Sequence, residues 1–280
     1  MAQDLKEWID AEVAPYRDKP IEWLSQYHFF RDPARAAYVD HRYFFSPADG
    51  VVVYQKVVDP DESIIDIKGK PYALRTALRD DSFAHRCLVI GIFMTFFDVH
   101  INRMPYGGRL SFTLAEPIGT FNLPMLAMEQ DVLEQLRIDP ANAGYLHRNE
   151  RMINRVDVPG LGGSYWMLQI ADYDVDSITP FRQRQGVYRS QGRRFSQIRY
   201  GSQVELVIPV SEAFSHTPPG RRAACEGGHR PAGEGPPEMT AGRRRAGSAA
   251  AGRASLVFCA LAPRAVPSPG AWPPGRAGRR

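Results

Sequence analysis

Hydrophobic positions recur at helical spacing near the N-terminus of the chain. One face of the first predicted helix carries four apolar residues, Leu5, Trp8, Ile9 and Val13. Asp4 precedes them and Glu7 follows three positions later, which is the form of a capping box. Residues 21–30 are rich in aromatic side chains and predict further short helices. We therefore expect a helical N-terminal segment over residues 1–42.

The apolar residues of this segment allow two interpretations. They predict a helical cap that packs on the rest of the protein. They could also form an amphipathic surface that rests in a membrane interface, with Trp23 and Tyr27 at the depth of the lipid headgroups. The polar positions between them are mixed in charge rather than rich in Lys and Arg, which favours the cap.

From Tyr43 onward the pattern becomes typical of β-strands. Apolar residues at every second position of Val204–Ile208 predict a strand, and the high apolar content of Leu88–Ile101 predicts one long buried strand. The best helix signal of this region has five apolar positions, Leu126, Met128, Val132, Leu133 and Leu136. We expect an α+β fold that is mainly β, with a compact antiparallel β sandwich or barrel-like core over residues 43–214.

The composition changes abruptly after this region. Residues 216–280 contain 14 Ala, 11 Gly, 11 Arg and 10 Pro, with no Ile, Tyr or Lys. Such a segment buries too little apolar surface to offset chain entropy, so residues 215–280 are predicted to be a disordered tail. The abrupt change suggests out-of-frame translation of a GC-rich gene, and the alternative is an Arg-rich arm for acidic lipids or nucleic acid.

Net charge follows the same division. The 11 Arg and three Glu of residues 216–280 leave 24 basic and 28 acidic residues in the preceding part. The excess of positive charge therefore belongs to the tail, and we expect no nucleic-acid binding by the body. Only Cys87 of the three cysteines lies in the body, so neither a disulfide nor a metal site is expected.

The sequence carries no signal for membrane insertion. The N-terminus lacks the apolar core of a signal peptide. The longest apolar run, Cys87–Phe97, is too short to span a bilayer. We expect no transmembrane helix and a protein kept in a reducing compartment.

Two Gly-Ser steps precede predicted strands. Gly201-Ser202 comes directly before the alternating strand, and on its own such a step predicts only a turn. Gly163-Ser164 follows a Gly-rich stretch, and we expect it to be a loop without a chemical role.

Three separated stretches carry a family resemblance. They are Phe45-Ser46-Pro47-Ala48-Asp49-Gly50, Phe97-Asp98-Val99-His100-Ile101-Asn102-Arg103-Met104-Pro105 and Tyr200-Gly201-Ser202. Together, in this order, they resemble the phosphatidylserine decarboxylase family, in its short bacterial and pyruvoyl-dependent form. The resemblance extends from about Tyr43 to Pro209, and the tail diverges from the family.

The resemblance implies a specific chemistry. Family members are proenzymes in which the serine hydroxyl attacks the preceding carbonyl group, and the chain then breaks. Cleavage between Gly201 and Ser202 would give chains 1–201 and 202–280, with Ser202 converted to a pyruvoyl group. This covalent cofactor forms a Schiff base with the substrate amine and accepts electrons as carbon dioxide leaves. Phosphatidylserine becomes phosphatidylethanolamine, which implies a peripheral protein on the cytoplasmic face of the membrane and allows a homo-oligomer.

The same resemblance assigns roles to two side chains in these stretches, and the strand pattern suggests one for a third. It implies that Asp49 is the carboxylate of the self-cleavage machinery, although Asp49 alone would be a turn residue. It implies that His100 is the acid that protonates the substrate, although the residue alone would be a buried strand histidine. Asp98 could orient the imidazole from the same strand face, or be a solvated charge at the strand end.

The sequence departs from the family at two places. The long form of the family has a second histidine where this chain has Arg103, so His100 is the simplest candidate for both proton transfers. The family strand that begins at the cleaved bond is followed by a Gly- and Val-rich hairpin, which is absent after Val210. We therefore expect the strand that carries Ser202 to lack a neighbour.

Two alternatives to the decarboxylase remain open at this point. The chain could be a C-terminally damaged relative that does not cleave itself and has no activity. It could also be a pyruvoyl-dependent decarboxylase of a soluble amino acid, although such chains lack the sequence contexts of Asp49 and His100.

Overall fold

A computed structural model describes most of the chain before residue 211. The described residues are 4–35, 39–41, 43–161, 163–174, 176–181 and 184–210, with three later strands, β14 (Phe214–His216), β15 (Ala224–Cys225) and β16 (Ala254–Leu256). Apart from these short strands, the predicted disordered tail lies outside the described residues, so its disorder stays a prediction.

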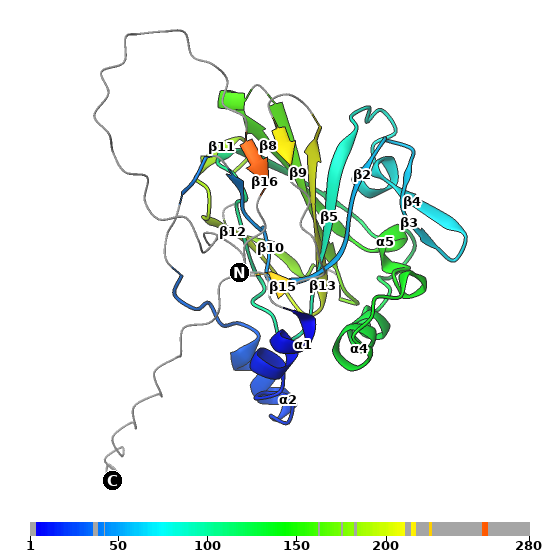
Figure 1. Ribbon diagram of the computed structural model, residues 1–280, viewed down its shortest axis with the longest axis vertical. Coiled ribbons are helices and arrows are strands. Elements are labelled where there is room, and N and C mark those ends of the chain that lie inside the picture. Colours follow the sequence, from blue (N-terminus) through cyan, green and yellow to red (C-terminus); the bar gives the residue numbers. More distant parts are fainter. Residues whose placement is uncertain are drawn as a thin grey trace, which may run out of the picture.

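Among the described residues, eight strands form one large sheet (Figure 1). Their order across the sheet is β11 (Val187–Arg189), β7 (Gly108–Ala115), β8 (Arg151–Val158), β9 (Gly163–Ala171), β13 (Ser202–Pro209), β5 (Cys87–Met94), β2 (Gly50–Val58) and β15. Every pairing within this sheet is antiparallel. The strand predicted from the alternating pattern therefore lies in the interior of the sheet.

Strand β13 has a hydrogen-bonded neighbour on each side. Residues 202–209 pair with β5, and residues 202–207 pair with β9. The expectation that this strand lacks a neighbour is wrong, because both of its partners come from earlier in the chain. The departure of the sequence after Val210 leaves this pairing intact.

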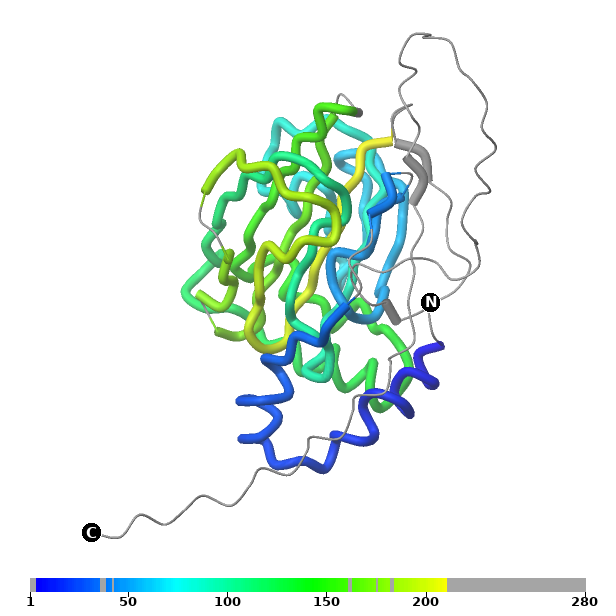
Figure 2. The backbone as a smooth tube through the Cα atoms, turned by 90° about the vertical axis from the view of Figure 1, so that its left-hand side faces the viewer, coloured from blue at the N-terminus to red at the C-terminus, as the bar shows by residue number. Residues whose placement is uncertain are grey.

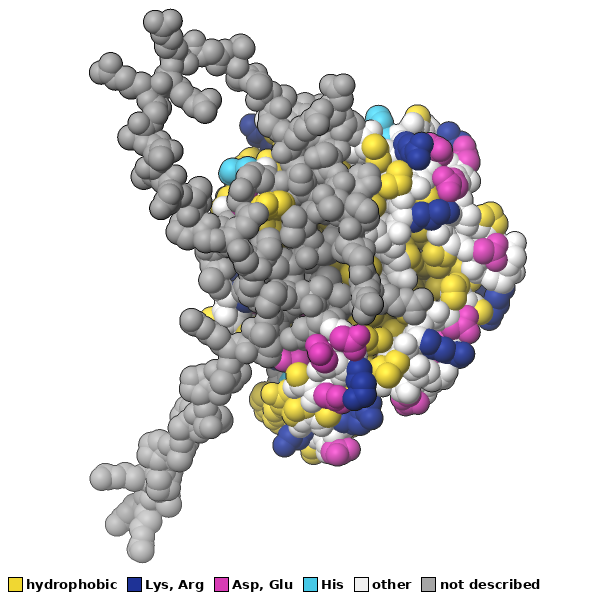
Figure 3. Space-filling model, in the orientation of Figure 1, with side chains coloured by type: hydrophobic (Ala, Val, Ile, Leu, Met, Phe, Trp, Pro, Cys, Tyr) yellow, Lys and Arg dark blue, Asp and Glu magenta, His cyan; other side chains and the backbone are white. Residues whose placement is uncertain are grey.

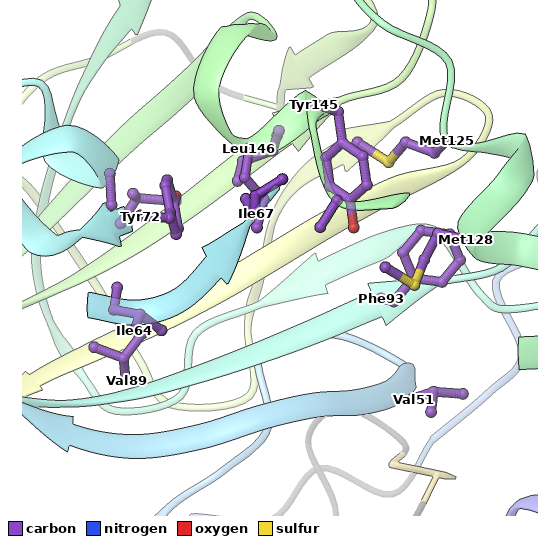
Figure 4. Packing of buried hydrophobic residues seen from close by; sticks show 14 of the residues in the cluster. Val51, Ile64, Ile67, Tyr72, Val89, Phe93, Met125, Met128, Tyr145 and Leu146 are labelled. Atoms are coloured by element: carbon purple, nitrogen blue, oxygen red, sulfur yellow. The ribbon is translucent and has the colours of Figure 1, made fainter. Parts of the chain in front are cut away.

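One face of the large sheet packs against helices and a hairpin. These elements are α1 (Leu5–Trp8), η1 (Ile9–Val13), β3 (Ser63–Ile67), β4 (Lys70–Ala73), α3 (Leu74–Leu78), α4 (Leu126–Gln135), η3 (Pro140–Asn142) and α5 (Tyr145–Arg148). In the core between these layers, Val89 of β5 lies beside Ile64 and Phe93 lies beside Met128 (Figure 4). Burial of this apolar surface is the main stabilising term for the layer.

The other face of the sheet packs against a small three-stranded sheet. Its strands are β10 (Ile178–Pro180), β12 (Arg194–Ile198) and β6 (Ile101–Arg103). A second core of buried residues lies between the sheets and includes Ile92, Val204, Leu206 and Phe195. The short strand β1 (Tyr43–Phe44) adds Phe44 to this core, and η4 (Pro159–Leu161) connects β8 to β9. The predicted antiparallel, mainly β fold with N-terminal helices is confirmed.

The N-terminal segment forms a helical arm that lies beside the β body (Figure 2). It contains α1, η1, α2 (Ile21–Trp23) and η2 (Leu24–His28). The Asp4 carboxylate accepts a hydrogen bond from the backbone of Lys6 at 2.9 Å, which confirms the predicted N-cap. The four apolar residues of the first predicted face are all buried.

The prediction of one long buried strand is wrong. The predicted strand Leu88–Ile101 is interrupted, because β5 ends at Met94 and β6 begins at Ile101. A turn connects them, since the backbone N–H of Asp98 donates to the Thr95 carbonyl at 3.0 Å. The helix predicted from five apolar positions is confirmed as α4, although Leu126 and Leu136 are exposed.

Positive and negative side chains alternate over the described surface on the face shown in Figure 3. This distribution fits the near balance of acidic and basic residues in the body. No helix among the described residues is long and apolar enough to cross a bilayer.

Replacing Leu206 with Ala tests the central position of β13. Leu206 is fully buried between the sheets, so its truncation should cost about 2–5 kcal/mol in the free energy of unfolding. Leu126→Ala is the matched control because this leucine is 62% exposed, and the expected change is within about 0.5 kcal/mol. Urea unfolding followed by tryptophan fluorescence measures both. An equal loss of unfolding free energy in the two variants would contradict the burial of Leu206 between the two sheets.

Candidate active site

The three stretches that carry the family resemblance meet at one end of the large sheet. Ser202 is the first residue of β13 and pairs directly with Met94, the last residue of β5. Asp49 immediately precedes Gly50, the first residue of β2, which is the other neighbour of β5. Gly50 has a φ of +150°, and a Cβ there would collide with the carbonyl oxygen of Phe93. Glycine therefore permits the close approach of β2 to β5 at this point.

Ser202 and His100 form the contact at the centre of the site. The Ser202 Oγ lies 3.4 Å from His100 Nδ1, and both residues are fully buried. The other ring nitrogen, Nε2, lies 2.8 Å from the carbonyl oxygen of Thr95. Because a carbonyl oxygen can only accept, Nε2 carries the hydrogen and Nδ1 offers a lone pair to the serine hydroxyl.

Burial keeps the imidazole neutral. Desolvation lowers the pKa of His100 to about 4, while the hydrogen bond to Thr95 and the Asp49 carboxylate act in the opposite direction. At neutral pH the ring is therefore a free base positioned to accept a proton from Ser202. A buried strand histidine, the alternative from the sequence, would not explain this contact with the serine.

Asp98 acts on the turn rather than on the imidazole. It lies in the turn between β5 and β6, so the predicted shared strand face with His100 is wrong. Its Oδ2 accepts hydrogen bonds from the backbone N–H and hydroxyl group of Thr95, each at 2.8 Å. The residue is buried, which also excludes a solvated charge. Asp98 therefore fixes Thr95, whose carbonyl fixes the histidine tautomer.

Asp49 is buried and paired with an arginine of the N-terminal segment. Both guanidinium nitrogens of Arg35 bind the Asp49 carboxylate, with Arg35 Nη1 2.8 Å from Oδ1. Asp49 lies within electrostatic range of His100, although the hydrogen bonds described here join it to Arg35. The structure thus brings Asp49 into electrostatic range of the Ser202–His100 pair.

The N-terminal segment covers the histidine. The ring of Phe29 lies 4.2 Å from the ring of His100, measured between centroids, and 5.8 Å from that of Tyr200. Arg31 donates hydrogen bonds to the carbonyl oxygens of Phe97 at 2.5 Å and Asp98 at 3.2 Å. These contacts exclude water from His100 and tie the turn to the arm.

The backbone before Ser202 is constrained. Tyr200 has a φ of +65°, which is uncommon for a residue with a side chain. A Cβ on Gly201 would lie 2.6 Å from Asp172 Oδ2, so a larger residue here would displace the Asp172 side chain. Local strain and close packing therefore coincide with the Gly201–Ser202 bond.

The other residues singled out in the sequence lie apart from this contact. Arg103 pairs with Asp32 at 3.1 Å and does not replace the second histidine of the long family form as a base. Ser164 lies in β9 rather than in a loop, and its hydroxyl donates to Asp157 at 2.7 Å. It has no contact with the Ser202–His100 pair.

Sequence reasoning missed the residues that support this pair. Thr95, Phe29, Arg31, Arg35 and Asp172 all contact it or its neighbours. A turn signal was present for Thr95, because an acidic residue follows it three positions later. Phe29, Arg31 and Arg35 had no signal, since only the folded arm brings them to the site.

A buried serine in contact with a neutral histidine, at the start of a central β-strand, defines a protein equipped for nucleophilic attack by a hydroxyl group. Comparison with known protein families shows which family the chain belongs to. The family described as "Phosphatidylserine decarboxylase" matches residues 25–224. The chain belongs to this family, which confirms the resemblance stated from its motifs and the expected class of enzyme, a carboxy-lyase.

Individual relatives agree with this assignment. A protein of Erythrobacter litoralis is 31% identical over 188 residues, covering 66% of this chain and 64% of the relative. A protein of Novosphingobium aromaticivorans is 32% identical over 190 residues, covering 65% of this chain and 62% of the relative. Both are named phosphatidylserine decarboxylase proenzyme, and this chain spans slightly less than two thirds of each.

Asp98 predicts a pH dependence of stability. Burial raises the pKa of Asp98 to about 7, so the folded protein favours the protonated carboxyl group. The unfolded state loses this proton near pH 4, and stability is lost as the pH rises from there through 7. Asp98→Asn keeps an acceptor for Thr95 without the charge. The free energy of unfolding of this variant, measured relative to that of the wild type, should therefore be roughly 1–3 kcal/mol larger at pH 8 than at pH 5.

Urea unfolding at the two pH values measures this difference. Asp81→Asn is the control, because Asp81 is exposed and its substitution should leave the pH dependence unchanged. A pH dependence of Asp98→Asn identical to that of the wild type would contradict a buried titrating carboxyl group at this position.

Proposed function

We propose that the chain is a proenzyme that cleaves itself between Gly201 and Ser202 and then converts phosphatidylserine to phosphatidylethanolamine. The observation that carries the proposal is the 3.4 Å contact between Ser202 Oγ and His100 Nδ1 in a buried site. Membership of the phosphatidylserine decarboxylase family supports the reaction and the substrate. The names of the relatives, each a proenzyme, support the cleavage.

The first proposed step is attack by Ser202 Oγ on the carbonyl carbon of Gly201. His100 Nδ1 accepts the hydroxyl proton, and the peptide bond is exchanged for an ester. Elimination across Cα and Cβ of Ser202 then releases the Gly201 carboxylate. Addition of water and loss of ammonia leave a pyruvoyl group at position 202. The nearby Asp49 carboxylate stabilises the imidazolium that forms at His100.

The surroundings of Ser202 fit such a group. Ladder hydrogen bonds to β5 and β9 begin at this residue, so the new end of the second chain would stay beside His100 after cleavage. The group would supply an electrophilic carbonyl that withdraws electrons from the substrate as carbon dioxide departs. His100 Nδ1 would return a proton to the substrate carbon.

The arm provides a surface suited to lipid. Its inner residues, including Leu24 and Phe29, are buried, as the cap interpretation expects. Its outer residues include exposed Ile21, Tyr27 and Phe30, so the same segment presents apolar side chains outward. We include in the proposal a peripheral position on the cytoplasmic membrane face. Chains 1–201 and 202–280 would remain associated through β13.

Intact mass spectrometry of the purified protein tests the cleavage. We expect two chains divided at 201/202, the second beginning with a pyruvoyl group, and a single intact chain for Ser202→Ala. The cleaved protein should release carbon dioxide from phosphatidylserine vesicles and not from free serine. An intact wild-type chain would indicate a damaged relative that does not cleave itself. Turnover of free serine would indicate a decarboxylase of a soluble amino acid.

Replacing His100 tests the proposed base. His100→Ala should slow self-cleavage by about 10²-fold or more, because it removes the proton acceptor. His85→Ala is the control, since His85 is exposed and remote in its contacts. Gel densitometry of the uncleaved chain over time measures the rates. Unchanged cleavage in His100→Ala would remove this residue from the first step.

The pKa of His100 also predicts the pH profile of cleavage. A base with a pKa of about 4 stays unprotonated down to pH 5.5, so the wild-type rate should change less than about twofold between pH 8 and 5.5. A histidine with its ordinary pKa would lose about tenfold over this range. A tenfold fall would therefore contradict a desolvated imidazole as the base.

A further inference from the structure

Three arginines gather between the N-terminal arm and the small sheet. Arg35 pairs with Asp49, while Arg103 and Arg194 both pair with Asp32. Their side chains are 8%, 10% and 56% exposed, respectively, so the cluster extends from the buried site to the surface. It belongs to neither of the proton-transfer steps described above.

Arg103 and Arg194 are directly opposite each other on β6 and β12. Like charges in this arrangement repel and destabilise a sheet. Arg35 adds a third positive charge within electrostatic range of Arg103. Asp32 pairs with two of these arginines at once, so Arg103 and Arg194 share one carboxylate in their described ion pairs.

Arg103 has unused hydrogen-bonding capacity. Its Nη1 donates to the Gly192 carbonyl at 3.3 Å, and its Nη2 donates to Asp32. Within the described part of the chain, its buried Nε has no hydrogen-bond partner. Buried guanidinium nitrogens are normally satisfied. The Nε atoms of Arg79 and Arg189 also lack a partner, and Arg103 differs from them in facing two further arginines. Burial and the two neighbouring arginines also lower the pKa of Arg103, which is the effect an added anion would reverse.

An ion-pair clamp for the arm is the simpler alternative. Asp32 belongs to the arm, and its two ion pairs fasten the arm to β6 and β12. One arginine would suffice for such a clamp. It explains neither why Arg103 and Arg194 share Asp32 nor the unpartnered Nε of Arg103.

We infer that Arg103, with Arg35 and Arg194, binds the phosphodiester anion of the substrate headgroup. The inference rests on the proposed function. Guanidinium groups bind phosphate oxygens through paired, charge-assisted hydrogen bonds. In phosphatidylserine, only one CH₂ group and one oxygen atom separate the reacting carbon from the phosphorus atom. The phosphate must therefore lie close to the reacting centre, and Arg103 is within electrostatic range of Asp49, which is in turn within range of His100.

The first experiment measures anion binding without catalysis. Full-length protein carrying Ser202→Ala is heated in sodium phosphate or in sodium chloride of equal ionic strength. Phosphate should raise the unfolding midpoint of this parent, and Arg103→Gln should remove most of the rise. Arg155→Gln is the matched control, because Arg155 forms a surface ion pair with Asp157 and should leave the rise intact. If Arg103→Gln fails to fold, Arg194→Gln replaces it as the test variant, because the Arg194 side chain is exposed, and it should reduce the rise in the unfolding midpoint.

The second experiment uses the cleaved protein and phosphatidylserine vesicles. Arg103→Gln should raise KM at least about tenfold with little change in kcat, and Arg103→Lys should recover part of the loss. A phosphate effect that survives Arg103→Gln would overturn the inference and leave only the clamp. A lost phosphate effect with an unchanged KM would assign the cluster to free phosphate and overturn the lipid assignment. If the parent enzyme lacks decarboxylase activity altogether, the proposed function fails, while the first experiment still decides the anion site.

Discussion

The two-sided pairing of β13 is the constraint on which the rest of the site depends. A strand that is hydrogen bonded to β5 and β9 from its first residue cannot shift without breaking both ladders. Ser202 is therefore fixed relative to Met94, and Met94 leads directly into the turn that carries Thr95 and His100. A short path through the backbone thus joins Ser202 to His100. Few flexible bonds lie between them, so their relative position is set by the sheet itself.

The opposite face of β13 adds a second anchor. Glu205 is fully buried and accepts hydrogen bonds from the hydroxyl groups of Tyr54 and Tyr72. Gln203 accepts a hydrogen bond from Tyr145 at 2.7 Å, which connects the strand to α5. Burial raises the pKa of Glu205, while these hydrogen bonds oppose the rise and stabilise the carboxylate. Polar groups buried in this way stabilise a structure only when they are satisfied, so they favour one register of the strand.

The sequence predicted those parts of the site that depend on local patterns. Alternation in Val204–Ile208 located β13, and the spacing of the N-terminal apolar residues located a buried helical face. The strand predicted from continuous apolar character is wrong at Thr95–His100, because a buried turn and a buried strand have the same composition there. The role of Asp98 was missed for the same reason. The Arg35–Asp49 pair could not be predicted, since it joins two segments whose meeting depends on the complete fold.

The arm has to satisfy two opposing requirements if both proposed reactions occur. Attack by Ser202 on its own backbone is favoured by the dry surroundings that Phe29 provides, because desolvation keeps His100 neutral. Decarboxylation needs a lipid headgroup to reach the same imidazole. The arm is held near the site by the buried ring of Phe29 and by polar contacts, those of Arg31 with the turn and of Asp32 with two arginines. An anion or a new acceptor can replace the partners of such polar contacts, whereas nothing polar can replace the apolar core beneath β13. For a headgroup to reach His100, Phe29 and the polar contacts around it would have to shift, while pairing on both sides keeps the strand that carries Ser202 in place.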